Sequence, residues 1–231
     1  TPCVGIMLRE LGCDGGIVIT ASHNPLPYNG IKLLLSNGMA PPAPTAAKIK
    51  QAFLDGKARY VDSVHCGTVS RNDDTDRVHV NKVLATIEAR QIKARRYRIV
   101  LDSVNGAGAR VAKKLLMELG CEVIAMNDEP SGLFAHGAEP IAANLGDLCR
   151  RVQQEKADLG FAQDPDADRL AIVDENGVYI GEEYTLALAA KHVFSKQGGT
   201  AAANLSTSRM IDDIAARVGA RVLRTPVGEA H

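Results

Sequence analysis

The chain has 231 residues, of which 45% are hydrophobic and 23% are charged, and it contains no Trp. This length and composition suit one large domain or two to three small ones, and they exclude a disordered chain, a collagen-like repeat and a coiled coil. Lys plus Arg and Asp plus Glu number 27 each, so the formal net charge is zero. A nucleic-acid or membrane-surface partner attracted by overall charge is therefore not expected.

We expect no membrane or targeting segment. No apolar run approaches the ~20 residues that a membrane helix needs. The opening residues Thr1 to Val4 have neither the basic nor the apolar region of a secretory signal. The five cysteines are scattered and form no Cys-x-x-Cys pair. That pattern is typical of reduced thiols in a cytoplasmic protein and disfavours a disulfide framework or a cysteine-based zinc site.

Short apolar strands and amphipathic helices alternate along the chain, with turns rich in Gly, Pro and Asn between them. Strands are expected over 15–20, 31–35, 98–102, 121–125, 157–162, 170–173, 200–203 and 221–223. Helices are expected over 45–54, 78–90, 110–119, 145–156, 184–194 and 209–218. Residues 60–77 are polar and irregular and mark a boundary. The alternation predicts an α/β fold with a mixed or parallel sheet covered on both faces.

An acidic segment at 164–169, Asp-Pro-Asp-Ala-Asp-Arg, lies between two of these strands. Its three carboxylates repel one another unless a cation or a neighbouring Arg balances them, and hard oxygen ligands suit Mg²⁺ or Ca²⁺. We therefore expect Asp164, Asp166 and Asp168 to bind a divalent metal. The plain alternative is a solvated acidic turn.

Two known acidic loops fit this segment less well. In an EF-hand counted from Asp164, Glu175 takes the twelfth position, but Arg169 stands where that loop requires Gly, and the flanks read as strands. A haloacid-dehalogenase-type phosphatase has a strand that leads into Asp-x-Asp, with the first Asp as nucleophile. Asp164 meets that requirement, whereas Asp168 and Arg169 differ from the usual continuation.

A second constellation is the turn Thr-Ala-Ser-His-Asn-Pro at 20–25, followed by Asn-Gly-Ile-Lys at 29–32. Ser22 follows a buried strand, in a turn that a proline stiffens. His23 and Lys32 are near enough in sequence to move protons or stabilise an anion. Alone, the pattern also suits an ordinary turn. A phosphorylated serine beside a divalent ion is, however, a good phosphoryl donor, and this links the two constellations.

The remaining candidates are weaker. The Gly-Ala-Gly at 106–108 follows a strand as a dinucleotide-binding turn does, but Val111 replaces the third glycine, so a plain strand–helix turn is the better interpretation. Four further histidines lack ligand spacing and are expected at the surface or in packing: His65, His79, His136 and His192.

Together the serine loop and the acidic loop resemble the α-D-phosphohexomutase superfamily, which includes phosphoglucomutase- and phosphomannomutase-like enzymes. Glu139-Pro140, Asn144-Leu145 and the segment 224–229 agree with that family in the same order. Its metal loop usually reads Asp-Gly-Asp, and Pro165 stands in place of that glycine. The resemblance extends over essentially the whole chain.

The resemblance implies a phosphate carried on Ser22 and one Mg²⁺ per active site. The ion would be held by Asp164, Asp166 and Asp168, with a phosphoserine oxygen on Ser22 completing the shell. Phosphate would move between C6 and C1 of a hexose, glucose or mannose, through a bound hexose 1,6-bisphosphate. A phosphosugar is thus the expected partner, with no nucleic acid and no membrane, and a homo-oligomer is left open.

The resemblance also implies roles for the neighbouring side chains. His23 and Lys32 would transfer protons and contact phosphate, and Arg169 would balance charge beside the phosphoserine. Asn24 would shape the serine loop at the substrate, and Lys32 would contact the substrate as well. Glu229 stands where some members of the family have His and others Asp, and it is the remaining substrate-binding candidate.

Consecutive mixed-sheet α/β domains, incomplete at both ends, are the fold that the resemblance implies. Residues 1–76 would be the second half of domain 1, 77–178 domain 2, and 179–231 the first part of domain 3. Two alternatives remain open. One is an aspartyl-phosphate phosphatase with Asp164 as nucleophile, and the other is a non-catalytic, metal-binding remnant of a mutase.

Overall fold

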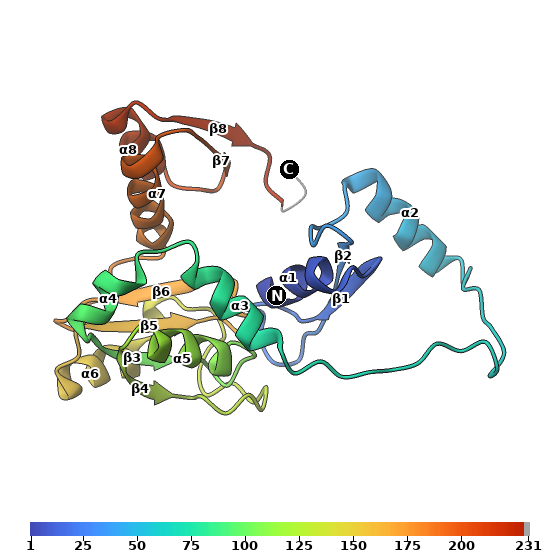
Figure 1. Ribbon diagram of the computed structural model, residues 1–231, viewed down its shortest axis with the longest axis horizontal. Coiled ribbons are helices and arrows are strands. Elements are labelled where there is room, and N and C mark those ends of the chain that lie inside the picture. Colours follow the sequence, from blue (N-terminus) through green and yellow to red (C-terminus); the bar gives the residue numbers. More distant parts are fainter. Residues whose placement is uncertain (229–231) are drawn as a thin grey trace.

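The computed structural model describes residues 1–228, and in these residues three small sheets follow one another along the chain (Figure 1). They are a hairpin of β1 and β2, a four-stranded sheet of order β4-β3-β5-β6, and a pair of β7 and β8. Helices accompany each sheet, which confirms the α/β class. Within the described part of the chain, no helix combines the length and the apolar character needed to cross a membrane.

The hairpin pairs β1 (Gly15–Ile19) with β2 (Ile31–Leu35) in antiparallel register, as the two apolar runs predict. Helix α1 (Pro2–Leu11) packs on it through Leu8, which joins Val18 and Leu34 in a small core. This helix was not expected from the sequence. Its signals are nevertheless present, because Pro2 begins it and Gly12 ends it in the left-handed conformation.

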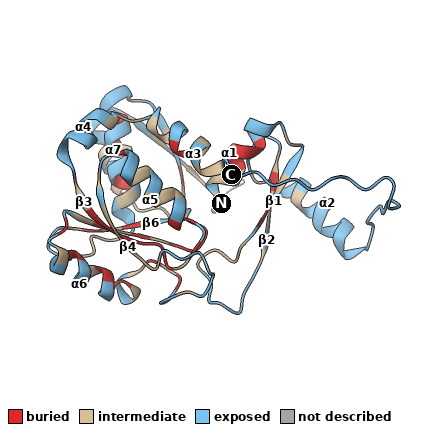
Figure 2. Ribbon diagram, turned by 60° about the horizontal axis from the view of Figure 1, so that its bottom comes forward, coloured by how far each residue is buried: buried red, intermediate tan, exposed pale blue. Residues whose placement is uncertain are grey.

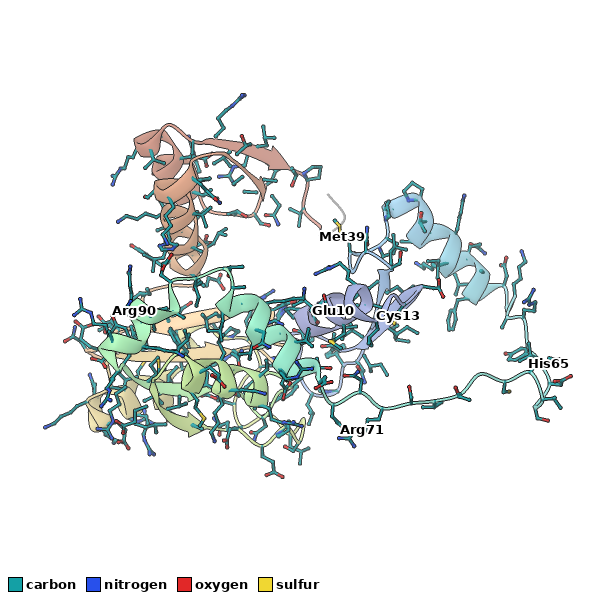
Figure 3. All side chains as sticks on the ribbon, viewed as in Figure 1. Glu10, Cys13, Met39, His65, Arg71 and Arg90 are labelled. Atoms are coloured by element: carbon teal, nitrogen blue, oxygen red, sulfur yellow. The ribbon has the colours of Figure 1, made fainter. Side chains whose placement is uncertain are left out.

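After the hairpin, the chain runs out into helix α2 (Ala43–Leu54) and a long segment without regular structure over 55–74. None of the residues of α2 is buried. Figure 3 shows His65 and Arg71 on the extended segment, well away from the central sheet. Most of the polar segment predicted at 60–77 is thus an exposed connection, although residues 75–77 already belong to the next helix, and His65 is a surface residue as expected.

The central sheet is mixed. Strands β3 (Arg98–Asp102), β4 (Glu122–Met126) and β5 (Leu159–Gln163) are parallel, and β6 (Leu170–Val173) is antiparallel to β5. Helices α5 (Ala109–Glu118) and α6 (Gly146–Glu155) cover its opposite faces (Figure 2). The short 3₁₀ helix η1 (Ala142–Asn144) precedes α6. Apolar side chains with no exposed surface form the core under α6: Val100, Leu145, Leu148, Val152 and Val173.

The single helix predicted over 78–90 is wrong. The structure has α3 (Thr75–Leu84) and α4 (Ala89–Arg95), separated by a turn at 85–88. Thr86 explains the break, because both its N–H and its hydroxyl donate to the carbonyl of Val83, at 3.0 and 2.8 Å. A short polar side chain that binds the preceding turn in this way competes with the regular helical pattern.

The third group of elements is α7 (Glu183–Gln197), β7 (Thr200–Asn204), α8 (Met210–Val218) and β8 (Arg221–Thr225). The two strands are parallel, and Phe194, Ala203, Ile211 and Ala215 form their core. The hydroxyl of Thr185 donates to the carbonyl of Leu170 at 2.6 Å and so ties α7 to the central sheet.

The topology of the central sheet decides where the functional loops lie. Strands β3 and β5 are parallel neighbours, with Asp102 opposite Ala162. Their carboxyl ends therefore meet at one edge, which is where open α/β sheets place ligands. The turn at 103–108 follows β3 and the acidic segment at 164–168 follows β5, so the two lie side by side there.

Candidate functional site

The acidic segment folds into a tight loop around the carboxylate of its first residue. Asp164 Oδ1 accepts the backbone N–H groups of Asp168 and Arg169, both at 3.1 Å. Its carbonyl accepts the N–H of Ala167 at 3.0 Å, and Ala167 has φ of 54°. Asp164 and Asp166 are buried, at 0% and 4% exposure, whereas Asp168 is exposed.

The serine loop joins β1 to β2 and is closed by its own polar groups. The N–H of Ser22 donates to Thr20 Oγ1 at 2.8 Å, and the Asn24 side-chain amide donates to the carbonyl of Ala21 at 2.8 Å. Ser22 has φ of 53°, in the left-handed region that serine seldom adopts. Such strain persists where the surroundings impose it, and it frequently marks functional positions.

The two loops meet, although 142 positions separate their key residues. Ser22 Oγ donates to Asp164 Oδ2 at 3.4 Å and lies 3.2 Å from His23 Nδ1. Lys32, on β2, reaches across with its ammonium at 3.2 Å from Asp166 Oδ2 and 3.3 Å from Asp168 Oδ2. The hydroxyl, the imidazole, the ammonium and the three carboxylates predicted from the sequence thus form one cluster.

Crowding of carboxylates inside the loop perturbs their protonation. Burial raises the pKa of Asp164, and the hydrogen bond that its protonated carboxyl donates to Asp166 and the charges of Asp168 and Asp166 raise it further. Burial also acts to raise the pKa of Asp166, but hydrogen bonds from Thr1, Asp164 and Lys32 outweigh it and lower that pKa. Asp164 is therefore the carboxyl of this pair that is protonated more readily.

These residues fit a divalent cation. Asp164, Asp166 and Asp168 each offer a carboxylate oxygen, and these oxygens lie within 4.8 Å of one another. Asp166 Oδ1 is buried and has no hydrogen-bond partner, which is costly unless something positive satisfies it. An all-oxygen set of this kind is the preference of Mg²⁺. Bound there, Mg²⁺ would neutralise charge on a phosphoryl group held at Ser22.

A brace for the acidic loop comes from the glycine turn after β3. The N–H of Ala107 donates to the carbonyl of Pro165 at 2.8 Å. A Cβ on Gly106 would lie 2.6 Å from that same oxygen, and one on Gly108 would lie 2.5 Å from the Cβ of Ala167. The glycines therefore allow two backbones to touch, and the plain strand–helix turn predicted at 106–108 is confirmed.

The loop between β4 and α6 forms the other wall and contributes Glu139. Its Oε1 lies 3.0 Å from Arg169 Nη1 and 3.9 Å from His23 Nε2. Arg169 is the residue directly after the acidic triplet, and its guanidinium is paired with the Glu139 carboxylate. Sequence reasoning noted Glu139 only as a point of agreement with the family, since no spacing rule links it to residue 23 or 169.

A contact between a buried carboxylate and an imidazole anchors the same wall. Asp102 is 1% exposed, and its Oδ2 lies 3.0 Å from His136 Nε2. The N–H of Val104 and the side-chain amide of Asn127 donate to Oδ1 at 3.0 and 2.9 Å. Asp102 therefore connects the turn after β3 with the loop that carries Glu139. From the sequence, His136 was expected to be a surface or packing residue, and its contact with Asp102 was not predicted.

Of the predicted residues, Arg169 is paired with Glu139, and the others fall into three groups. The structure brings together Ser22, His23, Lys32 and the acidic triplet. Asn24 closes the serine loop and, with Ser22, lines a cavity of about 450 Å³. That volume lies within the range of about 300–1,000 Å³ that is typical of small-molecule sites. Glu229 lies outside the described residues.

Comparison with known families agrees with this site. Models of the phosphoglucomutase/phosphomannomutase α/β/α domains I, II and III match residues 1–59, 76–177 and 181–231. Together the matches cover most of the chain. The chain belongs to the phosphoglucomutase/phosphomannomutase family, a family of mutase enzymes, as the two loops had indicated.

Individual relatives carry more than one mutase name. A protein of Methanopyrus kandleri named probable phosphoglucosamine mutase is 39% identical, over 100% of this chain and 51% of its own length. A phosphoglucomutase/phosphomannomutase of Thermococcus kodakarensis is also 39% identical, over 99% of this chain and 50% of its own length. This chain thus spans about half the length of the curated relatives it matches.

Solved structures share the fold. A phosphoglucomutase/phosphomannomutase family protein from Burkholderia thailandensis superposes with a TM-score of 0.80 at 27% identity. The superposition covers 94% of this chain and 46% of that one. The arrangement of α/β units described above is therefore that of the family.

Proposed function

We propose that the full-length protein containing this chain is a Mg²⁺-dependent phosphohexomutase that interconverts hexose 1-phosphate and hexose 6-phosphate. The observation that supports the proposal is the 3.4 Å contact between Ser22 Oγ and Asp164 Oδ2, because it puts a hydroxyl beside the three carboxylates that we propose as Mg²⁺ ligands. The names of the relatives support a sugar phosphate as substrate and leave glucose, mannose and glucosamine phosphates to be compared. We expect the enzyme to work in the cytoplasm.

In this proposal, phosphate resides on Ser22 and passes to a hydroxyl of the sugar phosphate. The bond from Ser22 Oγ to phosphorus breaks, the sugar oxygen forms the new bond, and overall one proton moves from the sugar hydroxyl to Ser22 Oγ. The resulting 1,6-bisphosphate then reorients in the site and transfers its other phosphate back to Ser22. His23 Nδ1, at 3.2 Å, is the ring nitrogen placed to exchange a proton with Ser22. Lys32 contributes positive charge beside the carboxylates.

Mass spectrometry tests the proposal directly. After incubation with glucose 1,6-bisphosphate and Mg²⁺, the full-length protein should carry one phosphate on Ser22, and Ser22→Ala should abolish mutase turnover. Full turnover in Ser22→Ala would refute the assignment of the donor. Rates with glucose, mannose and glucosamine 1-phosphates would then rank the substrates.

The aspartyl-phosphate alternative is less well supported. Asp164 has no exposed surface, and its Oδ1 is occupied by two backbone N–H groups. A nucleophile must reach its substrate, and this carboxylate is instead built into the loop. Trapping with beryllium fluoride separates the two mechanisms, because an adduct on Asp164 would favour the phosphatase.

A further inference from the structure

Glu139 occupies a position between the serine loop and the acidic loop. One of its carboxylate oxygens, Oε1, faces two cationic or proton-bearing groups from different parts of the chain. Arg169 Nη1 lies at 3.0 Å and His23 Nε2 at 3.9 Å from it. On the other side of the imidazole, Nδ1 lies 3.2 Å from Ser22 Oγ. The serine, imidazole, carboxylate and guanidinium therefore follow one another in space, at hydrogen-bond distance for Ser22–His23 and Glu139–Arg169 and at the longer distance of 3.9 Å between His23 and Glu139.

The carboxylate bears on which ring nitrogen of His23 carries the proton. A neutral imidazole has one N–H and one lone pair, and a carboxylate beside one nitrogen favours the proton there. With Nε2–H facing Glu139, Nδ1 keeps a lone pair 3.2 Å from Ser22 Oγ, so the single hydroxyl hydrogen can turn from Asp164 to the imidazole when the proton is exchanged. The same carboxylate holds the guanidinium of Arg169, which would otherwise be drawn to the neighbouring aspartates.

The position of Glu139 is itself well determined. The side-chain amide of Asn144 donates to the Glu139 carbonyl at 2.8 Å. Ala138 is 7% exposed, and a Cβ on Gly137 would lie 2.5 Å from the amide of Asn144, so the backbone packs tightly there. Upstream, His136 is held by the buried Asp102. The backbone at Glu139 is thus held in place, and the 3.0 Å contact with Arg169 directs its carboxylate toward the two loops.

We propose that Glu139 is a positioning residue: it selects the Nε2–H tautomer of His23 and holds the Arg169 guanidinium away from the acidic triplet. The inference rests on the proposed function, since the value of the tautomer is that Nδ1 accepts the hydrogen of Ser22. Glu139 touches neither the hydroxyl nor the carboxylates, and it acts through His23 and Arg169.

The test compares Glu139→Ala with Glu155→Ala in the full-length protein. Glu155, on the remote helix α6, is the control, because its carboxylate also bridges two side chains, those of Arg98 at 3.1 Å and Arg151 at 2.9 Å. Nitrogen-15 chemical shifts of the His23 ring, recorded where imidazoles are neutral, report the tautomer. We expect mainly Nε2–H in the unsubstituted protein and in Glu155→Ala, and a mixture of tautomers in Glu139→Ala.

Steady-state kinetics provide a second test of the role of Glu139. Glu139→Ala should lower kcat about tenfold with less than about a twofold change in KM, and Glu139→Gln, which keeps an acceptor oxygen, should recover part of the loss. In a His23→Ala background, the same substitution should cost less than about threefold.

Each contrary outcome identifies what fails. Unchanged His23 shifts in Glu139→Ala, an equal loss in Glu155→Ala, or an undiminished loss in the His23→Ala background would overturn the positioning role. Absence of mutase turnover in the unsubstituted protein would instead overturn the proposed function, and the tautomer comparison would still decide the role of Glu139.

Discussion

Replacing Gly106 by alanine should loosen the acidic loop, because this glycine lies directly on the backbone of Pro165. The new Cβ would be 2.6 Å from the Pro165 carbonyl oxygen and 2.7 Å from its Cα. Ordinary contacts begin at 3.4 Å, so the two backbones must separate by about 0.8 Å. Neither contact is the tip of a flexible side chain, and the bond from Ala107 N–H to Pro165, now 2.8 Å, would be strained.

Forced overpacking of this kind costs about 1–3 kcal/mol of unfolding free energy. Displacing the support behind metal ligands lowers metal affinity by about tenfold or more. Urea unfolding measures the first effect, and calorimetric titration with Mg²⁺ measures the second. Gly67→Ala is the control, because its Cβ would meet no atom within 4 Å. If Gly106→Ala bound Mg²⁺ and unfolded like the unsubstituted protein, the turn would not act as a rigid brace for the acidic loop.

Three other substitutions test the remaining arguments. Asp166→Asn should lower Mg²⁺ affinity by about a hundredfold in calorimetric titration, because it removes a buried ligand charge. Leu148→Ala should cost about 2–5 kcal/mol in urea unfolding, since Leu148 has no exposed surface. A hydrogen bond with Asp102 raises the pKa of His136 above 6.5, so the stability this pair contributes is full below pH 6.5 and is lost as pH rises through the raised pKa. His136→Gln should remove this pH-dependent change, of about 1 kcal/mol, from the free energy of unfolding measured across that range.

The stability that this pair contributes is also lost at low pH, through protonation of Asp102. Burial acts to raise the pKa of Asp102, but hydrogen bonds from His136, Asn127 and the Val104 N–H outweigh it and hold that pKa below 3.8. A lowered carboxyl pKa contributes stability above the ordinary value that is lost as pH falls through the lowered one. The pair therefore stabilises the fold most between pH 3.8 and pH 6.5.

Much of the local structure followed from the sequence alone. The apolar runs predicted the strands, and the glycine and asparagine turns predicted their ends, because these signals act over a few residues. The helix predicted over 78–90 failed for a local reason that pattern reading overlooked, namely the hydrogen bonds of Thr86. The limits of the three domains, 1–76, 77–178 and 179–231, stay predictions.

The chemical character of the site was also determined by the sequence, since an acidic triplet and a serine–histidine turn carry their chemistry in their residue types. Which groups surround them was decided by the tertiary structure. Parallel pairing of β3 and β5 brings the glycine turn against the acidic loop. The loop after β4 places Glu139 at 3.0 Å from Arg169 and 3.9 Å from His23. These contacts join residues between 30 and 116 positions apart, and only the packing of the complete sheet determines them.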